Sequence, residues 1–266
     1  MPILTVPMEN GLGRTKGACL APGAILAELR SLAERSVSES GAPVSVDAEE
    51  LSLDLSNLEE AEKLIERKCA EILAGQKGMP VLIGGDHSLT YAAVKAFRKR
   101  YPKGGVLALD AHPDMMHAFH PPTHEDWLLT LLSDGILSPH DVALLGLRSM
   151  HQSEAERLRK MRIRQFPMRE ISMDSLAEIV DAAMMVCRQW EAVYLSVDID
   201  VVDPAFAPGT GYPEPGGLTS REFLYALTRL RMLPALRMAD LVEVNPRRDP
   251  GGATVRLAAK ALAELL

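Results

Sequence analysis

Three short stretches of the chain combine carboxylates and imidazoles at spacings that suit metal binding. Each follows an apolar run that is typical of a buried strand, so its polar residues would stand at the end of a rigid support. Residues two apart on an extended chain point the same way. Asp110 would therefore point to the same side as His112, and Asp198 to the same side as Asp200. The three stretches read GGDHS at 84–88, DAHPD at 110–114 and SVDID at 196–200.

The charges of these aspartates need a counterion. Two carboxylates about 4 Å apart repel by roughly 4 kcal/mol at an effective dielectric of 20, and the three stretches contain no lysine or arginine. Two divalent cations would neutralise four aspartates, and two neutral histidines would complete the ligand set. Oxygen and imidazole ligands without thiolate suit manganese better than structural zinc. The residues therefore predict a manganese pair with bridging carboxylates and a bridging water of lowered pKa.

Each stretch alone has a simpler interpretation. An aspartate at a strand end is usually a turn residue or a helix cap. The glycine pair Gly84-Gly85 can be a tight turn, and a single histidine such as His87 is more often a hydrogen-bonded structural residue. Short motifs have a high false-positive rate, so the prediction depends on their combination.

The elements that would position these residues form an alternating pattern. Short apolar runs alternate with helical periodicity, which predicts βαβ units and a mostly parallel sheet with its sites at the carboxyl strand ends. Helices are expected over 58–73 with Asn57 as N-cap, after a capping box at 219–222, and over 253–265. The expected strands are Ile3–Pro7, Val44–Asp47, Pro80–Ile83, Val106–Leu109, Val142–Gly146, Val193–Val197 and Ala239–Val244.

Composition narrows the class of protein. The 266 residues, 47% of them hydrophobic, fit one α/β domain over 1–266, with 9–23 as an ordered loop rather than a boundary. A net charge of -7 without a basic run argues against nucleic-acid binding. We find no run long enough to cross a membrane and no secretory signal. The scattered Cys19, Cys69 and Cys187 favour a reducing compartment, so we expect a cytoplasmic protein in which the last two thiols are buried.

Together with VEVNP at 242–246, the motifs GGDHS, DAHPD and SVDIDVVDP resemble the signatures of the arginase/agmatinase family of ureohydrolases. The resemblance spans roughly residues 80–250. It implies a three-layer α/β/α sandwich, a homo-oligomer (trimer or hexamer), and a binuclear manganese centre that hydrolyses a guanidino or related C–N bond. It also implies that Asp110 and Asp198 bridge the ions. One ion would be held by His87, Asp110, Asp114 and Asp198, and the other by Asp110, His112, Asp198 and Asp200.

The same resemblance implies roles in catalysis. Glu243 would bind the cationic guanidinium. His124, in the stretch THEDW, would shuttle a proton to the leaving amine, because the amine must be protonated as it departs. Asp114 would also orient the metal-bridging hydroxide that attacks the guanidino carbon. The products would be urea and an amine.

Departures from the family pattern bear on the substrate. Arginases read the α-amino acid end of arginine with an asparagine- and serine-containing loop. Here that loop, 115–123, is short and contains neither residue, which favours agmatine or a related guanidino compound. Tyr212 stands where many relatives have threonine, and His151 where arginases have an acidic residue; both are predicted beside the substrate. The loop after Asp203, stiffened by prolines, would hold Tyr212 and Glu214 near the metals.

Two other functions remain open on the sequence. A formiminoglutamate hydrolase would use the same metals and release formamide. A regulatory or interaction protein could keep the metal ligands after losing catalysis. The deacetylases of the same fold bind one zinc through fewer ligands, so the full six-residue set argues against them.

Overall fold

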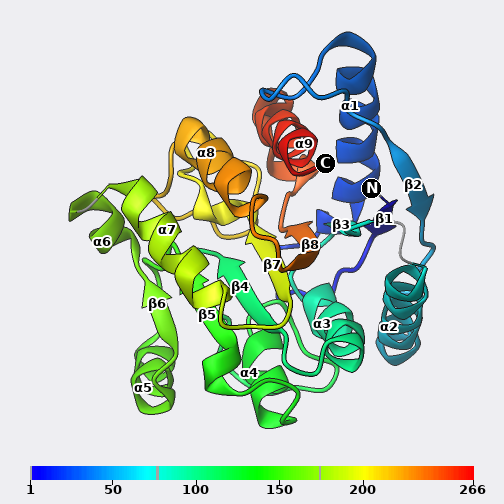
Figure 1. Cartoon of the computed structure of the whole chain (residues 1–266). Coiled ribbons are helices and arrows are strands. Elements are labelled where there is room, and N and C mark those ends of the chain that lie inside the picture. Colours follow the sequence, from blue (N-terminus) through cyan, green and yellow to red (C-terminus); the bar gives the residue numbers. More distant parts are fainter. Residues whose placement is uncertain (1, 76–77, 174) are drawn as a thin grey trace.

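The computed structural model describes residues 2–75, 78–173 and 175–266. Their centre is an eight-stranded sheet with the order β2-β1-β3-β8-β7-β4-β5-β6, in which every paired strand is parallel (Figure 1). The mostly parallel sheet predicted from the sequence is confirmed. The strands are β1 (Pro2–Val6), β2 (Asp47–Glu50), β3 (Val81–Gly84), β4 (Gly105–Leu109), β5 (Val142–Leu145), β6 (Arg164–Phe166), β7 (Val193–Asp198) and β8 (Leu236–Val242).

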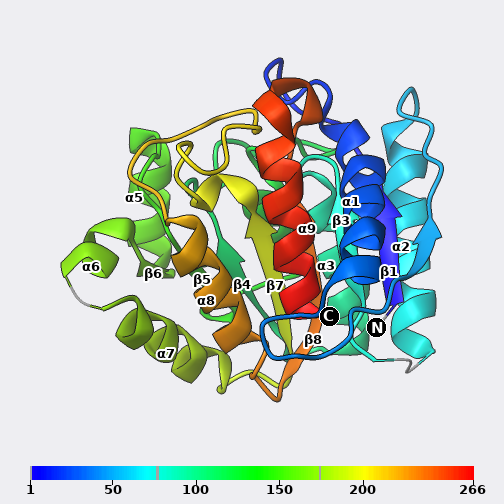
Figure 2. The same cartoon turned by 90° about the horizontal axis from the view of Figure 1, so that it is seen from above.

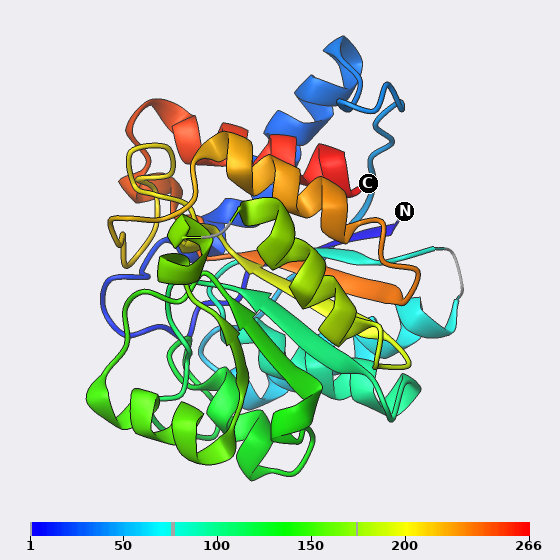
Figure 3. The same cartoon turned by 60° about the vertical axis from the view of Figure 1, so that its left-hand side comes forward.

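Helices cover both faces of the sheet, which confirms the predicted three-layer sandwich (Figures 2 and 3). Alternate strand residues point to opposite layers. Thus Leu107 and Leu109 pack in one core, while Val106 and Ala108 pack in the other. The first layer holds α1 (Ala21–Arg35), α6 (Met168–Met173), α7 (Leu176–Cys187), α8 (Ser220–Leu230) and α9 (Ala253–Leu265). The second layer holds α2 (Leu58–Ala74), α3 (Leu89–Arg100), α4 (Trp127–Ser133) and α5 (Gln152–Met161).

The predicted helix signals are confirmed. The Asn57 side chain accepts a hydrogen bond from the backbone of Glu60 at the start of α2. Thr219 and Glu222 form the reciprocal capping box that begins α8, and each such cap satisfies backbone donors that the helix leaves free. Helix α9 has the predicted bounds. Cys69 and Cys187 are buried thiols, as expected. None of the helices within the described ranges combines the length and apolarity that a membrane crossing requires.

The structure corrects three expectations at the periphery. The second strand lies at Asp47–Glu50 rather than 44–47, because it pairs with β1 as an exposed acidic edge and not as an apolar run. The edge strand β6 was not predicted, since its three residues include an exposed arginine and show no apolar pattern. The stretch 9–23 is not loop throughout: a 3-10 turn covers Ala18–Leu20, and α1 begins at Ala21.

The strand order explains why the motifs meet. β3, β8, β7 and β4 are consecutive neighbours in the middle of the sheet. Because all four are parallel, their carboxyl ends lie at one edge. The register pairs Leu109 with Val197, and Val197 with Leu241, so the residues that follow these positions emerge side by side.

Candidate metal centre and adjacent pocket

The turn after β3 is fixed by close backbone packing. Gly85 lies against the N-terminal segment, where an added Cβ would stand 1.9 Å from the carbonyl oxygen of Met8. The Gly85 and Asp86 amides donate to the Val6 and Met8 carbonyls at 3.0 Å each. A residue with a side chain would not fit here. Glycine is therefore what lets this turn place His87 at the centre of the sheet edge.

His87 faces three carboxylates. Its Nδ1 lies 3.3 Å from Oδ2 of Asp110, 3.0 Å from Oδ2 of Asp114 and 3.2 Å from Oδ2 of Asp198. This nitrogen is buried and makes no hydrogen bond within the described chain. A buried polar atom rarely lacks a partner. A lone pair aimed at three carboxylate oxygens is what a shared cation would require.

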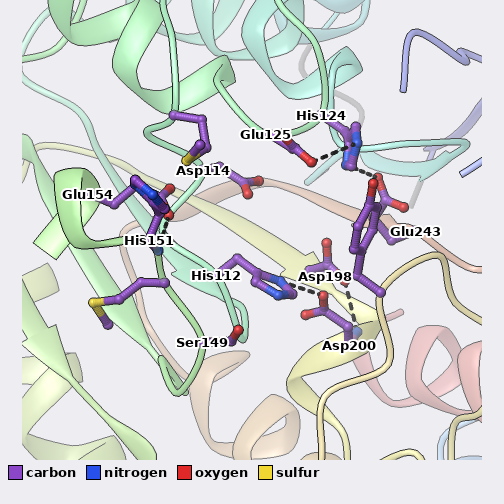
Figure 4. Close-up of a pocket in the computed structure, with 13 residues that line it drawn as sticks. His112, Asp114, His124, Glu125, Ser149, His151, Glu154, Asp198, Asp200 and Glu243 are labelled. Carbon is purple, nitrogen blue, oxygen red and sulfur yellow. Dashed lines mark hydrogen bonds and ion pairs between the residues drawn. The ribbon is translucent and has the colours of Figure 1, made fainter. Parts of the chain in front are cut away.

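His112 forms the second half of the cluster. Its Nδ1 lies 2.9 Å from Oδ2 of Asp200 and 3.7 Å from Oδ1 of Asp110. Within each of two triads the possible ligand atoms lie within 4.8 Å of one another, and Asp110 belongs to both triads. Figure 4 shows His112, Asp198 and Asp200 close together at the base of a pocket. The triads are His87, Asp110 and Asp198, and Asp110, His112 and Asp200.

The electrostatics of the cluster also fit divalent cations. Burial, together with the charges of Asp114 and Asp200, raises the pKa of Asp110 well above its usual value. Burial and the charges of Asp200 and Asp110 do the same to the pKa of Asp198. Desolvation and like charge both disfavour ionised carboxylates, and bound cations reverse this effect. The residues therefore fit a pair of hard divalent ions.

Other contacts hold the carboxylates in place. Trp127 Nε1 donates to Oδ2 of Asp114 at 2.7 Å, and Asp114 has a left-handed backbone with φ of 52°. The backbone amide of Ala111 donates to Oδ1 of Asp200 at 3.1 Å. The amide of Asp200 donates to Oδ1 of Asp198 at 2.8 Å. Strained backbone in a non-glycine residue concentrates at functional sites.

Glu243 and His124 come together beside the cluster. Glu243 follows β8 with φ of 66°, and its Oε1 accepts a hydrogen bond from the His87 amide at 2.8 Å. His124 Nδ1 lies 3.7 Å from the same oxygen, while its buried Nε2 has no hydrogen-bond partner among the described residues. Burial lowers the pKa of His124 to about 4. The imidazole is therefore neutral over the physiological range and able to accept a proton.

Tyr212 lies over His124. The two rings stack with centroids 5.3 Å apart and planes 29° apart. The Tyr212 hydroxyl donates to the Leu12 carbonyl at 3.0 Å, so it also joins the N-terminal loop. Glu214, in the same loop as Tyr212, places Oε1 3.7 Å from Nε2 of His112. The loop after Asp203 thus brings both side chains next to the cluster.

His151 lies on the opposite wall of the pocket from His124 and Glu243 (Figure 4). It is the N-cap of α5, and its Nδ1 accepts a hydrogen bond from the Ser153 amide at 3.2 Å. The other loop histidines lie elsewhere: His120 contacts Asp134, and His117 stacks on Phe119.

The pocket wall is acidic and apolar. Among the residues that the structure describes, no lysine or arginine lines it. Arg148 has a side chain that could bind a substrate carboxylate, but its guanidinium donates to the carbonyl oxygens of Asp200 at 2.5 Å and Glu214 at 2.8 Å. The lining residues are His112, Asp114, Met116, His124, Glu125, Ser149, Met150, His151, Glu154, Asp198, Asp200, Tyr212 and Glu243.

Sequence reasoning missed several of the residues that support this site. Trp127 fixes Asp114, and Ser196 and Asp240 extend from His87 into the core. Asp240 carried a signal, because it interrupts an apolar strand with a charge, and buried charges are rarely unpaired. Glu125 and Glu154 on the pocket wall had no distinguishing pattern.

The chain belongs to the arginase family: the family profile described as "Arginase family" matches residues 1–266. It is 32% identical to an agmatinase of Halalkalibacterium halodurans, over 83% of this chain and 74% of the relative. It is also 32% identical to a guanidinobutyrase of Pseudomonas aeruginosa, over 98% and 83% of the two chains. The solved formimidoylglutamase of Bacillus subtilis superposes with a TM-score of 0.91 at 26% identity, over 99% of this chain and 85% of that one.

This membership defines the class of enzyme. The protein is a hydrolase of the amidinohydrolase type, which acts on C–N bonds of linear amidines. The family resemblance inferred from the four motifs is confirmed.

Proposed function

We propose that the protein is a binuclear manganese amidinohydrolase that releases urea from agmatine or a related guanidino compound with no carboxylate at its far end. The metal centre is supported by two ligand triads that share Asp110. The substrate class is supported by one observation above all: the described lining of the adjacent pocket contains carboxylates but no lysine or arginine.

The metals and the protein groups would have separate tasks. Two divalent ions held by His87, Asp110, His112, Asp114, Asp198 and Asp200 would supply a nucleophilic water near neutral pH. The remaining tasks belong to the chain. Glu243 pairs with the guanidinium and orients its carbon toward the carboxylate cluster. Neutral His124 accepts a proton from the attacking water at Nε2 or Nδ1 and delivers it to the departing nitrogen.

The pocket lining outside the metal cluster discriminates between substrate tails. Glu125 lies 3.8 Å from Nε2 of His124, and Glu154 accepts from the His151 amide on the opposite side, so carboxyl groups stand on both sides of a pocket that Met116 and Met150 also line. This arrangement suits an aliphatic tail ending in an amine. Tyr212 and His151 contact this tail from opposite sides. A tail carboxylate would be desolvated without a cationic partner, and burying an unpaired charge is unfavourable. Arginine has one such group and formiminoglutamate has two, so both rank below agmatine.

Three further expectations belong to the same proposal. The chain forms one domain over 1–266, assembles as a trimer or hexamer, and resides in the cytoplasm. Analytical ultracentrifugation and cell fractionation test the last two.

The decisive experiment combines metal counting with product analysis. Purified protein is loaded with Mn²⁺, dialysed and analysed for bound metal, then assayed with agmatine, arginine, guanidinobutyrate and formiminoglutamate. We expect close to two ions per chain and urea release that is fastest with agmatine. Saturation at one ion rejects the binuclear centre. Formamide from formiminoglutamate as the main product would replace the proposed substrate.

Glu243→Gln tests the guanidinium-binding role. Glutamine keeps an oxygen that can accept from the His87 amide, while the negative charge is lost. We expect KM to rise and kcat to fall, because the charge contacts the cation in both the ground and transition states. Metal content should not change. Loss of metal from this variant would place Glu243 in the ligand shell instead.

A further inference from the structure

A buried polar chain extends from His87 away from the pocket and into the sheet. Nε2 of His87 lies 2.9 Å from Oγ of Ser196, and that hydroxyl lies 2.8 Å from Oδ1 of Asp240. Ser196 and Asp240 have no exposed surface. Neither lines the pocket, and neither is a candidate ligand of the metals.

The direction of these hydrogen bonds is set at Asp240. Its Oδ2 accepts from the hydroxyls of Tyr194 at 2.6 Å and Thr90 at 2.7 Å. Its Oδ1 accepts from the Val197 amide at 3.3 Å and from Ser196. An ionised carboxylate only accepts, so the Ser196 proton points to Asp240.

The direction of the Ser196 hydrogen bond determines the tautomer of His87. Because the Ser196 proton is committed to Asp240, the serine oxygen presents a lone pair to the imidazole. Nε2 of His87 must then carry a proton and donate it. The lone pair of the neutral ring is left on Nδ1, which is the nitrogen that faces Asp110, Asp114 and Asp198 at 3.0–3.3 Å.

We propose that Asp240, acting through Ser196, is a positioning residue that holds His87 in its metal-binding tautomer and orientation. The inference rests on the proposed metal centre, whose His87 half it supports. An outer partner on the second ring nitrogen fixes a ligand's tautomer and raises its basicity, and losing such a partner typically lowers metal affinity by about 10–100-fold.

The two histidines of the centre differ in this respect. Nε2 of His112 faces the carboxylate of Glu214 at 3.7 Å, beyond hydrogen-bond distance and on a surface loop. His87 alone has a chain of buried partners behind it within the described structure. Breaking the Ser196–Asp240 link should therefore weaken the ion at His87 and leave the ion at His112.

Ser196→Ala is the first test variant, because it deletes one hydroxyl and leaves Asp240 with three donors. Asp240→Asn is the second, since it keeps the shape and removes the charge. Thr90→Val is the matched control: it also removes one buried hydroxyl bonded to Asp240, on the oxygen that does not face Ser196.

The measurement is Mn²⁺ binding by equilibrium dialysis, with electron paramagnetic resonance of the same samples. We expect the unmodified protein to bind two ions. In Ser196→Ala and Asp240→Asn, one ion should keep its affinity, and the affinity for the other should fall by about 10–100-fold. The spectrum of two coupled ions should become that of an isolated ion. Thr90→Val should bind two ions as the unmodified protein does.

Several outcomes would overturn the inference. Two ions of unchanged affinity in Ser196→Ala would remove the link from metal binding. Equal losses of Mn²⁺ affinity in Ser196→Ala and Thr90→Val would indicate that the core is destabilised in general. The metal-free proteins would then also unfold at lower temperature. If Asp240→Asn does not fold, the comparison of the other two variants decides. An unmodified protein that never binds a second ion would instead refute the proposed centre, and this inference with it.

Discussion

The pocket has two regions that are built differently. What we call the floor is the set of residues at the carboxyl ends of four central strands: His112, Asp114, Asp198, Asp200 and Glu243, which line the pocket, and His87 and Asp110, which contact them. The rim consists of loop residues: Met116, Glu125, Met150, His151 and Tyr212. Floor side chains are buried, apart from the 24% exposed His112. Rim side chains reach solvent, and Met150 is 37% exposed.

The difference follows from what holds each region. Sheet register and backbone amides fix the floor, as in the 2.8 Å hydrogen bond from the Asp200 amide to Asp198. Loop-to-loop contacts fix the rim, as in the hydrogen bond between Tyr212 and Leu12. Loops tolerate change better than sheets do. The floor can therefore preserve one chemistry across a family while the rim selects the substrate.

The largest expected effect comes from the floor. Asp198→Ala removes a buried carboxylate 3.2 Å from His87 that we expect to bridge both ions, and we expect less bound Mn²⁺ and a fall in kcat of about 10³-fold or more. Metal ions contribute several kcal/mol of transition-state stabilisation, and each 1.36 kcal/mol is tenfold in rate. Metal analysis and steady-state kinetics check this. Asp54→Ala removes an exposed carboxylate elsewhere and serves as control. Full metal content in Asp198→Ala would refute the ligand assignment.

The next effect lies between floor and rim, at His124. We expect His124→Asn to lower kcat by roughly 10²–10⁴-fold, the usual contribution of a general acid–base group, with KM less affected. Metal content should be unchanged, because His124 is outside both ligand triads. Kinetics on metal-counted samples provide the test. An unchanged kcat would exclude His124 from proton transfer.

The same division explains what the sequence could predict. The floor depends on local spacing, such as Asp110 with His112, and on the parallel direction of the strands, which βαβ alternation predicts. The members of the floor can therefore be predicted from the sequence. The edge strands β2 and β6 were misplaced or missed because polar edges lack an apolar pattern.

Contacts between distant segments could not be predicted from the sequence. Tyr212 and Leu12 are 200 residues apart, and nothing local indicates that they meet. The Trp127 bond to Asp114 and the Ser196–Asp240 pair are also tertiary contacts. Each contact depends on which side chains the packed layers bring together, and the hydrophobic periodicity of the sequence does not predict such pairs.

The rim should govern the choice of substrate. Agmatine and arginine differ only by the α-carboxylate, so their ratio isolates the response to that group. We expect kcat/KM to favour agmatine by about 10–100-fold, because an unpaired buried polar group costs about 1–3 kcal/mol. Urea assays at matched metal loading measure the ratio. A preference for arginine would require a group outside the described lining that binds the α-carboxylate.

The smallest effect, and the sharpest test of the division, comes from Tyr212. Tyr212→Thr removes the ring that stacks on His124 and stands edge-on to His112, and it opens space at the rim without substituting a floor residue. An aromatic pair contributes about 0.5–1.5 kcal/mol, so we expect kcat/KM for agmatine to fall by about 2–12-fold. The agmatine-to-arginine ratio should shift, because the enlarged rim admits a bulkier tail, while bound Mn²⁺ stays the same. Tyr212→Phe keeps the ring and loses only the hydrogen bond to Leu12, so it should stay close to the unmodified protein in that ratio.

If Tyr212→Thr loses metal, then floor and rim are coupled and the two regions do not act separately. If neither the rate nor the ratio changes, Tyr212 only closes the loop over the site, and the substrate tail is read by the opposite wall at His151 and Glu154.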